Sequence, residues 1–262
     1  MIKIQKYLKA WPITLVKETD KKIRIDKLIH DRGLAESRSQ AQSIIMAGSV
    51  FINNQRVDKP GTEVNINSEI EIKNSKKKYV GRGGLKLEKA IGEFAIDTDN
   101  IIALDIGAST GGFTDCLLQK GAKKVYAFDV GHGQFDWKLR NNEKVVVREK
   151  INCRYLKFED VGELVDLIVI DVSFISLKLI VSPALNVLKK DGVIIALIKP
   201  QFEAGRGEVG KGGVIRDEGK HREVVESIRS YFETLNLNII GVTPSPIEGA
   251  DGNKEFLICA IK

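Results

Sequence analysis

The chain has few of the residues that build disulfides and metal sites. It contains three cysteines and three histidines, and the cysteines are widely spaced without a C-x-x-C motif. This usage is typical of a reducing compartment, so we expect a cytoplasmic protein with no bound metal. Unbroken apolar runs, such as residues 193–198, fall far short of the roughly 20 residues of a membrane helix. We therefore predict no stable membrane insertion. The basic N-terminus also lacks the apolar segment and cleavage site of a secretory signal.

The positive charge is concentrated at the N-terminal end. Residues 1–84 hold 17 Lys and Arg against 9 Asp and Glu, whereas the rest of the chain holds 24 against 26. A basic small module beside a near-neutral large one suggests a first domain that binds a polyanion and a second that performs chemistry. Solvated surface charge is the alternative. A chain of 262 residues, 43% of them hydrophobic, is long enough for both domains.

Residues 1–22 form an N-terminal extension with a short amphipathic pattern. Ile4, Tyr7, Leu8 and Trp11 recur at helical spacing, and Pro12 ends the pattern. A helix here would pack on its own protein, contact RNA or lie on a membrane surface.

Residues 23–74 carry the pattern of a small α+β domain. We expect helices over 24–30 and 38–46, the second behind a capping box of Ser37 and Gln40, then a hairpin over 50–57 and further short strands. The order of Arg-x-Asp-Lys-Leu, Ser-Arg-Ser-Gln-Ala, Ile-x-x-Gly-x-Val and Val-Asp-Lys-Pro resembles the RNA-binding domain first described in ribosomal protein S-four. In that domain, phosphate contacts would come from Arg24, Lys27, Arg32, Arg38 and Arg56. A protein-binding module is the alternative.

Residues 75–84 are basic and glycine-rich, which is typical of a domain boundary. We interpret them as a linker and hinge, with Arg82 as a further RNA contact. From residue 85 to residue 262, strands and helices alternate. Strands are expected near 125–130, 145–148, 166–172 and 193–199, helices over 177–188 and 217–235, and a final antiparallel pair over 238–243 and 255–261. This order predicts a Rossmann-like α/β sheet, mostly parallel with an antiparallel last strand, that binds ligands at its carboxyl edge.

Residues 101–115 read as a strand, a glycine-rich turn and a helix. Glycines let a ligand lie directly on the backbone, and the helix N-terminus offers unpaired N–H groups. The turn lacks the Gly-Lys-Ser/Thr ending of a P-loop and the strict G-x-G-x-x-G of NAD-binding proteins. It does match the acidic D-x-G-x-x-x-G-G turn of S-adenosylmethionine (SAM) methyltransferases. Residues 107–111 also match the G-x-S-x-G elbow of α/β-hydrolases, with Asp171 and His221 following Ser109 in hydrolase order, so that alternative stays open.

A second acid favours SAM, because Asp129 ends the next strand about 20 residues later, where a carboxylate accepts from ribose hydroxyls. We expect Asp105 at the amino or sulfonium end of the cofactor and Glu149 at the adenine edge. The predicted cofactor-binding residues are Asp105, Gly107, Ser109, Gly111, Asp129 and Glu149.

Four charged residues fall where this topology brings several elements to one crevice. Lys86 lies on the helix before the first strand, Asp171 and Lys199 end two strands, and Glu255 opens the last strand. Singly, each is readily explained as a charge where the sheet meets water. Together with a SAM turn they predict a catalytic cluster.

Residues 105–115, 129–134, 171–177, 199–203 and 210–217 resemble the TlyA family of ribosomal RNA 2′-O-methyltransferases, which are related to FtsJ and often called haemolysins. The resemblance implies an S-four-like domain joined to a SAM-dependent methyltransferase domain that modifies cytidine ribose in ribosomal RNA or ribosomal subunits. It implies a catalytic tetrad of Lys86, Asp171, Lys199 and Glu255. The chain departs from the family at residues 1–22 and at Gly81, where serine is expected. A pore-forming haemolysin and an RNA-binding module with an inactive methyltransferase domain are the alternatives.

The chemistry of the reaction fits these residues. A ribose 2′-hydroxyl is a weak nucleophile, so in-line attack on a methyl group needs a positioned proton acceptor. Lysine serves if burial and a neighbouring cation lower its pKa. We predict that Lys199 takes this role, with Lys86 as the cation and the two acids orienting the amine and the hydroxyl.

Overall fold

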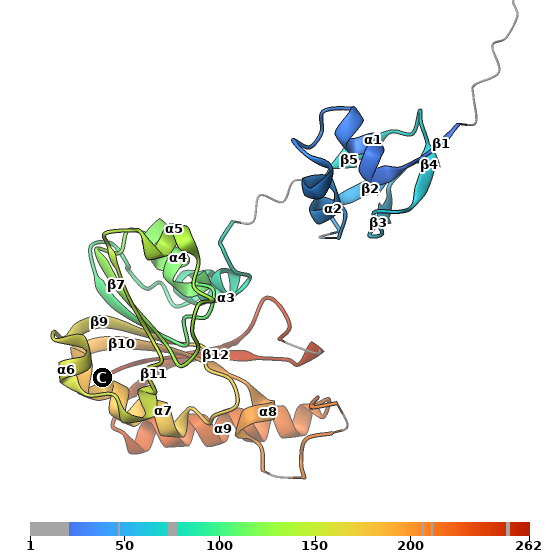
Figure 1. Ribbon diagram of the computed structural model, residues 1–262. Helices are drawn as coiled ribbons and strands as arrows, with labels where there is room; N and C mark the ends of the chain where they lie inside the picture. The colour runs from blue at the N-terminus through green and yellow to red at the C-terminus, as the bar shows by residue number, and fades with distance from the viewer. Residues whose placement is uncertain (1–20, 47, 73–77, 206, 211, 250–251) are drawn as a thin grey trace, which may run out of the picture. The chain divides into compact units, whose positions relative to one another are not determined.

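The computed structural model describes residues 21–46, 48–72, 78–205, 207–210, 212–249 and 252–262 (Figure 1). The chain divides into two compact units, residues 1–76 and 77–262. Each unit has its own hydrophobic core, so each is described by itself. The helix expected over residues 4–11 lies outside the described residues.

The small unit is an α+β domain. Its described elements are β1 (Lys22–Arg24), α1 (Ile25–Asp31), α2 (Arg38–Met46), β2 (Val50–Ile52), β3 (Gln55–Val57), β4 (Glu63–Asn65) and β5 (Ile70–Ile72). β1 pairs antiparallel with β4, and β2 lies between β3 and β5. The expected hairpin is confirmed, because Asn53 and Asn54 take the positive φ angles (48° and 64°) that a tight hairpin turn requires.

The capping box predicted for α2 is half formed. The backbone N–H of Gln40 donates to the Ser37 hydroxyl over 3.2 Å, as expected. The Gln40 side chain instead accepts from the backbone N–H of Glu36 over 2.6 Å, one residue earlier than in a capping box. The helix still begins at Arg38 and buries Ile45 in the core of the unit.

The large unit is built on a seven-stranded sheet in the order β11-β12-β10-β9-β6-β7-β8. Its strands are β6 (Ile102–Ile106), β7 (Lys124–Asp129), β8 (Val145–Glu149), β9 (Val165–Ile170), β10 (Leu188–Ile198), β11 (Asn238–Pro244) and β12 (Phe256–Ile261). β12 is antiparallel to both of its neighbours, whereas the ladders from β10 across to β8 are parallel. The predicted Rossmann-like sheet, mostly parallel with an antiparallel last strand, is confirmed.

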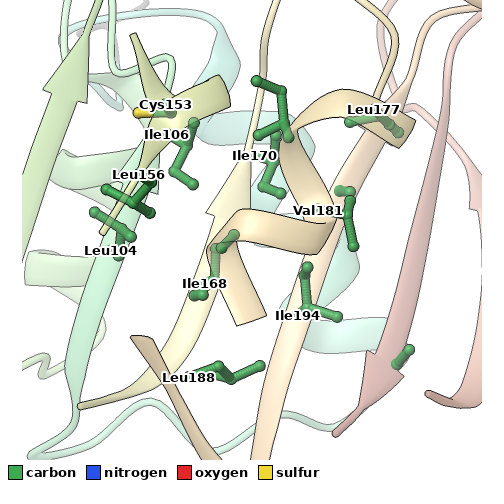
Figure 2. Packing of buried hydrophobic residues seen from close by; sticks show 14 of the residues in the cluster. Leu104, Ile106, Cys153, Leu156, Ile168, Ile170, Leu177, Val181, Leu188 and Ile194 are labelled. Atoms are coloured by element: carbon green, nitrogen blue, oxygen red, sulfur yellow. The ribbon is translucent and has the colours of Figure 1, made fainter. Parts of the chain in front are cut away.

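Helices cover both faces of this sheet (Figure 1). The described helices are α3 (Gly83–Glu93), α4 (Gly112–Gln119), α5 (Trp137–Arg140), α6 (Phe158–Val161), α7 (Lys178–Ala184), α8 (Pro200–Glu203) and α9 (Glu218–Thr234). Side chains alternate along β10: Ile194 packs with α7 and α9, and Ile195 with α3 and α4. Figure 2 shows part of the cluster that contains Ile194, with Leu104 on β6, Ile168 on β9 and Val181 on α7. Successive side chains of a strand point to opposite faces of the sheet, and both faces are buried. Consecutive residues of the strand are therefore apolar, which explains the unbroken apolar runs in the sequence.

The helix expected over residues 177–188 is shorter than predicted. α7 ends at Ala184, a 3₁₀ turn follows over Leu185–Val187, and Leu188 already belongs to β10. Pro183 lies inside α7 and lacks the N–H of an α-helical hydrogen bond, so the helix cannot continue regularly past it. The longer β10 contains a register shift between Leu188 and Val193.

The end of the predicted linker belongs to the large unit. Tyr79 is buried, the backbone N–H of Val80 donates to Asp115 over 2.8 Å, and α3 already begins at Gly83. A Cβ on Gly81 would lie 2.6 Å from the Thr110 hydroxyl, so the serine expected from the resemblance would require Thr110 to move. These contacts attach residues 78–84 to α4 and to the glycine turn, because glycines allow the backbones to approach closely.

The order of the strands places the ligand site. The chain runs from β6 outward through β7 and β8, then returns to β9 on the other side of β6. Ligands of such sheets bind at the carboxyl ends of the strands where the order reverses. There Gly107 has a φ of +86°, and a Cβ on it would lie 2.3 Å from the carbonyl oxygen of Asp171.

We predict that Gly107→Ala destabilises the large unit by about 2 kcal/mol or more, because it combines a left-handed backbone with a steric overlap. The control is Gly92→Ala, since a Cβ at this helical position meets nothing within 4 Å. That variant should be neutral or stabilised by up to about 1 kcal/mol. Urea unfolding followed by circular dichroism measures both, and equal stability of the two variants would contradict the prediction.

Candidate active site

A pocket of about 400 Å³ lies at the carboxyl ends of β6, β9 and β10. It brings together residues of the glycine turn and all four predicted tetrad residues. Its described lining is Arg82, Gly83, Lys86, Gly107, Ala108, Ser109, Thr110, Gly112, Phe113, Asp171, Ser173, Phe174, Lys199, Gln201, Phe202, Gly249 and Glu255.

Lys86 and Glu255 form the first ion pair of the pocket. Lys86 Nζ lies 2.6 Å from Glu255 Oε2, and the two side chains are only 7% and 2% exposed. Lys86 projects from α3, whereas Glu255 directly precedes β12. A Cβ on Gly249 would lie 2.1 Å from Glu255 Oε1, so glycine at this position leaves room for the carboxylate. Burial of both charges requires this pairing, since an unpaired buried charge costs several kcal/mol.

Lys199 and Asp171 form the second pair. Lys199 Nζ lies 2.6 Å from Asp171 Oδ1 and donates to Ser173 Oγ over 2.9 Å. Lys199 follows the end of β10 and Asp171 the end of β9, and these strands are parallel neighbours. Their carboxyl ends therefore meet at the same edge of the sheet, as the topology predicted.

The loop after β9 and helix α8 after β10 are joined at two further points. The Phe174 ring is 90% exposed, and its centroid lies 4.9 Å from that of Phe202. Glu203 accepts from the Ser176 hydroxyl over 2.6 Å and from the Leu177 N–H over 2.7 Å. Burial raises the pKa of the Glu203 carboxyl, although these hydrogen bonds oppose the shift.

The sequence by itself indicated no role for Ser173, Phe174 or Glu203. The available signal was their position, since all three lie in the motifs that carried the family resemblance. Contacts between the two motifs depend on the pairing of β9 with β10, which no local pattern encodes.

The glycine turn joins β6 to α4, as its sequence predicted. Gly111 precedes α4 with a φ of +97°, and a Cβ there would lie 2.5 Å from Leu139 Cδ1. Ser109 has a φ of +50°, and its backbone N–H donates to Asp129 over 2.7 Å. The Asp129 carboxylate at the end of β7 is therefore tied directly to the pocket wall.

Glu149 ends β8 and is the strand partner of Asp129. It accepts from the Gly133 N–H over 2.8 Å and from Arg140 over 2.8 Å, and lies 3.0 Å from His132. Its pKa is lowered, because the hydrogen bonds to the carboxylate outweigh the opposing effect of desolvation. Two carboxylates therefore lie side by side at the edge of the sheet.

Asp105 lies beneath the turn and is fully buried. Its Oδ2 accepts from the Thr114 hydroxyl over 2.7 Å, while its Oδ1 has no hydrogen-bond partner among the described residues. Burial raises the pKa of this carboxyl to about 7, against the opposing effect of the Thr114 hydrogen bond.

The hydrolase alternative fails on geometry. Asp171 is paired with Lys199, and His221 Nε2 lies 3.0 Å from the carbonyl oxygen of Ile215, with its ring edge against Phe256. His221 lines a different pocket, between α9 and the segment joining β11 to β12. The expected order of Ser109, Asp171 and His221 is present in the sequence, but the fold does not assemble a triad from them.

In the small unit, three of the arginines predicted to contact RNA have partners within the chain. Arg24 and Arg38 lie 2.9 and 3.1 Å from Oδ2 of the buried Asp26. These guanidinium groups, first of all Arg24, hold the pKa of Asp26 well below its usual range. Arg32 donates to the carbonyl oxygen of Ser68 over 2.8 Å.

The other three predicted RNA contacts differ in their surroundings. Lys27 and Arg56 are exposed on the small unit, and Arg56 lies against Gly48, where a Cβ would overlap its guanidinium. Arg82 instead lines the pocket of the large unit. The six predicted positions therefore divide between the two units.

The fold and the pocket define a Rossmann-like methyltransferase preceded by a small RNA-binding-type domain. Family models agree in both parts, since the FtsJ-like methyltransferase model matches residues 79–262 and the S4 domain model residues 23–70. The chain belongs to the FtsJ-like methyltransferase family.

Known relatives extend over most of the chain. Hemolysin A of Brachyspira hyodysenteriae is 47% identical over 90% of this chain and 98% of its own length. The 16S/23S rRNA (cytidine-2′-O)-methyltransferase TlyA of Mycobacterium tuberculosis is 41% identical over 91% of this chain and 89% of its own. A solved structure from Streptococcus thermophilus has 44% identity and a TM-score of 0.73, covering 93% of this chain and 89% of that one. The TlyA resemblance is confirmed.

None of the helices in the described part of the chain is long and apolar enough to cross a membrane.

The buried Asp105 carboxyl should make the stability of the protein depend on pH. Its pKa rises from an ordinary value of 3.8 to about 7 on folding, so the folded protein holds one proton more than the unfolded chain between these values. The Asp105 carboxyl makes its full contribution to the free energy of unfolding below about pH 4, and this contribution is lost as the pH rises through 7. Relative to Asp105→Asn, the wild type should lose about 1.4 kcal/mol of unfolding free energy per pH unit in this window. Denaturant unfolding at several pH values tests this, and a constant difference would contradict it.

Proposed function

We propose that this protein transfers the methyl group of SAM to a ribose 2′-hydroxyl of cytidine in ribosomal RNA. The observation that carries the proposal is the presence of two lysine–carboxylate pairs, Lys86–Glu255 and Lys199–Asp171, in one pocket with the glycine turn. The M. tuberculosis relative is named for this reaction, which supports the choice of cytidine and of ribosomal RNA. Because its substrate is ribosomal RNA, we expect the enzyme to act in the cytoplasm on ribosomal RNA or on ribosomal subunits.

The residues present fit SAM. Gly107, Ser109 and Gly111 form a turn on which the methionine part would lie, since two of them leave no space for a side chain. Asp129 would accept from the ribose hydroxyls, and Glu149 would lie toward the adenine. The buried Asp105 Oδ1, without a partner among the described residues, offers a hydrogen-bond acceptor beneath the amino or sulfonium end. When bound, SAM supplies an electrophilic methyl group.

The two ion pairs perform different tasks in the proposed reaction. Lys199 Nζ accepts the proton of the ribose 2′-hydroxyl, and Asp171 orients the amine and stabilises the ammonium that forms. Lys86 is the neighbouring cation, and Glu255, which is paired with it, orients the ribose hydroxyl. The ring of Phe174, at the pocket and 90% exposed, offers a face on which a nucleobase stacks.

The small unit would position the RNA. Exposed Lys27 and Arg56 would contact phosphates directly, whereas Arg24, Arg32 and Arg38 would do so with the guanidinium groups already oriented by Asp26 or by backbone carbonyls. Such contacts set the position of the RNA without reading its sequence.

Lys199→Ala should abolish methyl transfer while SAM still binds, because the variant removes the proton acceptor and leaves the glycine turn intact. Tritium transfer from labelled SAM to ribosomal subunits and to naked ribosomal RNA measures the first effect, and calorimetry with SAM the second. The matched control is Lys190→Ala. Lys190 is exposed and lies near the start of β10, at the end of the strand opposite to Lys199. Near-normal transfer by Lys199→Ala would refute the assigned role, and absence of transfer by the wild type would refute the function.

Lys27→Ala should weaken RNA binding without changing turnover at saturating RNA. Loss of one phosphate contact lowers the slope of log affinity against log salt by about 1. Filter binding of ribosomal RNA from low to moderate salt measures the slope, with Lys190→Ala again as the control. An unchanged slope would remove Lys27 from the RNA-binding surface.

A further inference from the structure

Lys199 has two close partners in the pocket, the Asp171 carboxylate in an ion pair and the Ser173 hydroxyl in a hydrogen bond, and the proposed mechanism uses only the first. Nζ lies 2.6 Å from Asp171 Oδ1 and donates to Ser173 Oγ over 2.9 Å. Both partners come from the loop after β9, two residues apart, and both line the pocket. The Lys199 side chain is only 10% exposed, so few other acceptors compete for its N–H groups.

This arrangement restricts the amine. An sp³ nitrogen has four bonding directions, one of which is the bond to Cε. The ion pair with Asp171 alone would leave the amine free to rotate about the Cε–Nζ bond. The hydrogen bond to Ser173 fixes the rotation, so one N–H of the neutral amine points to the Ser173 hydroxyl. Of the two directions left, the Asp171 carboxylate favours the second N–H on its side, and the lone pair takes the other.

We propose that Ser173 is a positioning residue for Lys199: its hydroxyl fixes the amine so that the lone pair points to the ribose 2′-hydroxyl. The inference rests on the proposed function. In the step, the 2′-O–H bond breaks and its proton goes to Nζ, giving an ammonium group. The oxygen forms a bond to the methyl carbon as the carbon–sulfur bond breaks, and that electron pair stays on sulfur. The hydrogen bond to Ser173 and the ion pair with Asp171 both persist in the ammonium form, so the amine need not reorient during the reaction.

The loop does not depend on the Ser173 hydroxyl for its shape. Glu203 holds Ser176 and Leu177 a few residues later, and the Phe174 ring packs against Phe202. Asp171 is anchored separately, because its N–H donates to the carbonyl of Ile106 over 2.9 Å. Removing one hydroxyl should therefore release the amine and leave the loop in place.

The test compares Ser173→Ala with Ser173→Thr, which keeps a hydroxyl, and with Ser182→Ala, an exposed serine on α7. Methyl transfer to ribosomal subunits gives kcat and KM, calorimetry gives the Kd of SAM, and thermal unfolding gives Tm. We expect Ser173→Ala to lower kcat about 10- to 100-fold, less than the roughly 100- to 10,000-fold contribution of a positioned proton acceptor, because Lys199 itself remains. KM, the Kd of SAM and Tm should stay near wild type, threonine should restore most of kcat, and Ser182→Ala should match the wild type.

Three outcomes would overturn the inference. Wild-type kcat in Ser173→Ala would show that the hydroxyl does not orient Lys199. A loss of kcat that threonine does not restore, together with a lower Tm or weaker SAM binding, would assign Ser173 a structural role only. Absence of transfer by the wild type itself would overturn the proposed function and this inference together.

Discussion

The close approach of two loops at the carboxyl ends of β6 and β9 is the constraint on which the large unit depends. The Asp171 N–H donates to the Ile106 carbonyl, and Gly107 lies against the Asp171 carbonyl at a φ that favours glycine. This contact brings the glycine turn beside the carboxylate that pairs with Lys199. A ligand on the turn and a substrate at the lysine can therefore meet in one pocket.

Charge pairing imposes the second constraint. Lys86 and Glu255 are 169 residues apart in sequence, yet they meet with little exposure to solvent. Removing either partner would leave an uncompensated buried charge, so the pair is stable only where α3 and β12 pack on the same part of the sheet. The same requirement gives Lys199 its own carboxylate from the neighbouring strand. The site consequently exists only in the assembled sheet.

Much of this arrangement follows from local patterns. Apolar runs that end in an acid predicted β6 and β7, and the glycines after β6 predicted the turn that leads into α4. Other features depend on neighbours that no local pattern names. The helix predicted to reach Leu188 ends at Ala184, because Pro183 interrupts it. The fold of the small unit brings Arg24 and Arg38 to the same carboxylate.

By itself, the sequence determined the two-part organisation, the mostly parallel sheet and the four charged residues that meet in the pocket, because periodicity, turn glycines and strand-end charges are local properties. Only the tertiary structure decided which charge pairs with which. It separated His221 from Asp171, placed Asp105 beneath the turn and gave Lys199 a second partner in Ser173. Pairing depends on strand order and on the close contact of distant backbones, and both are properties of the folded chain.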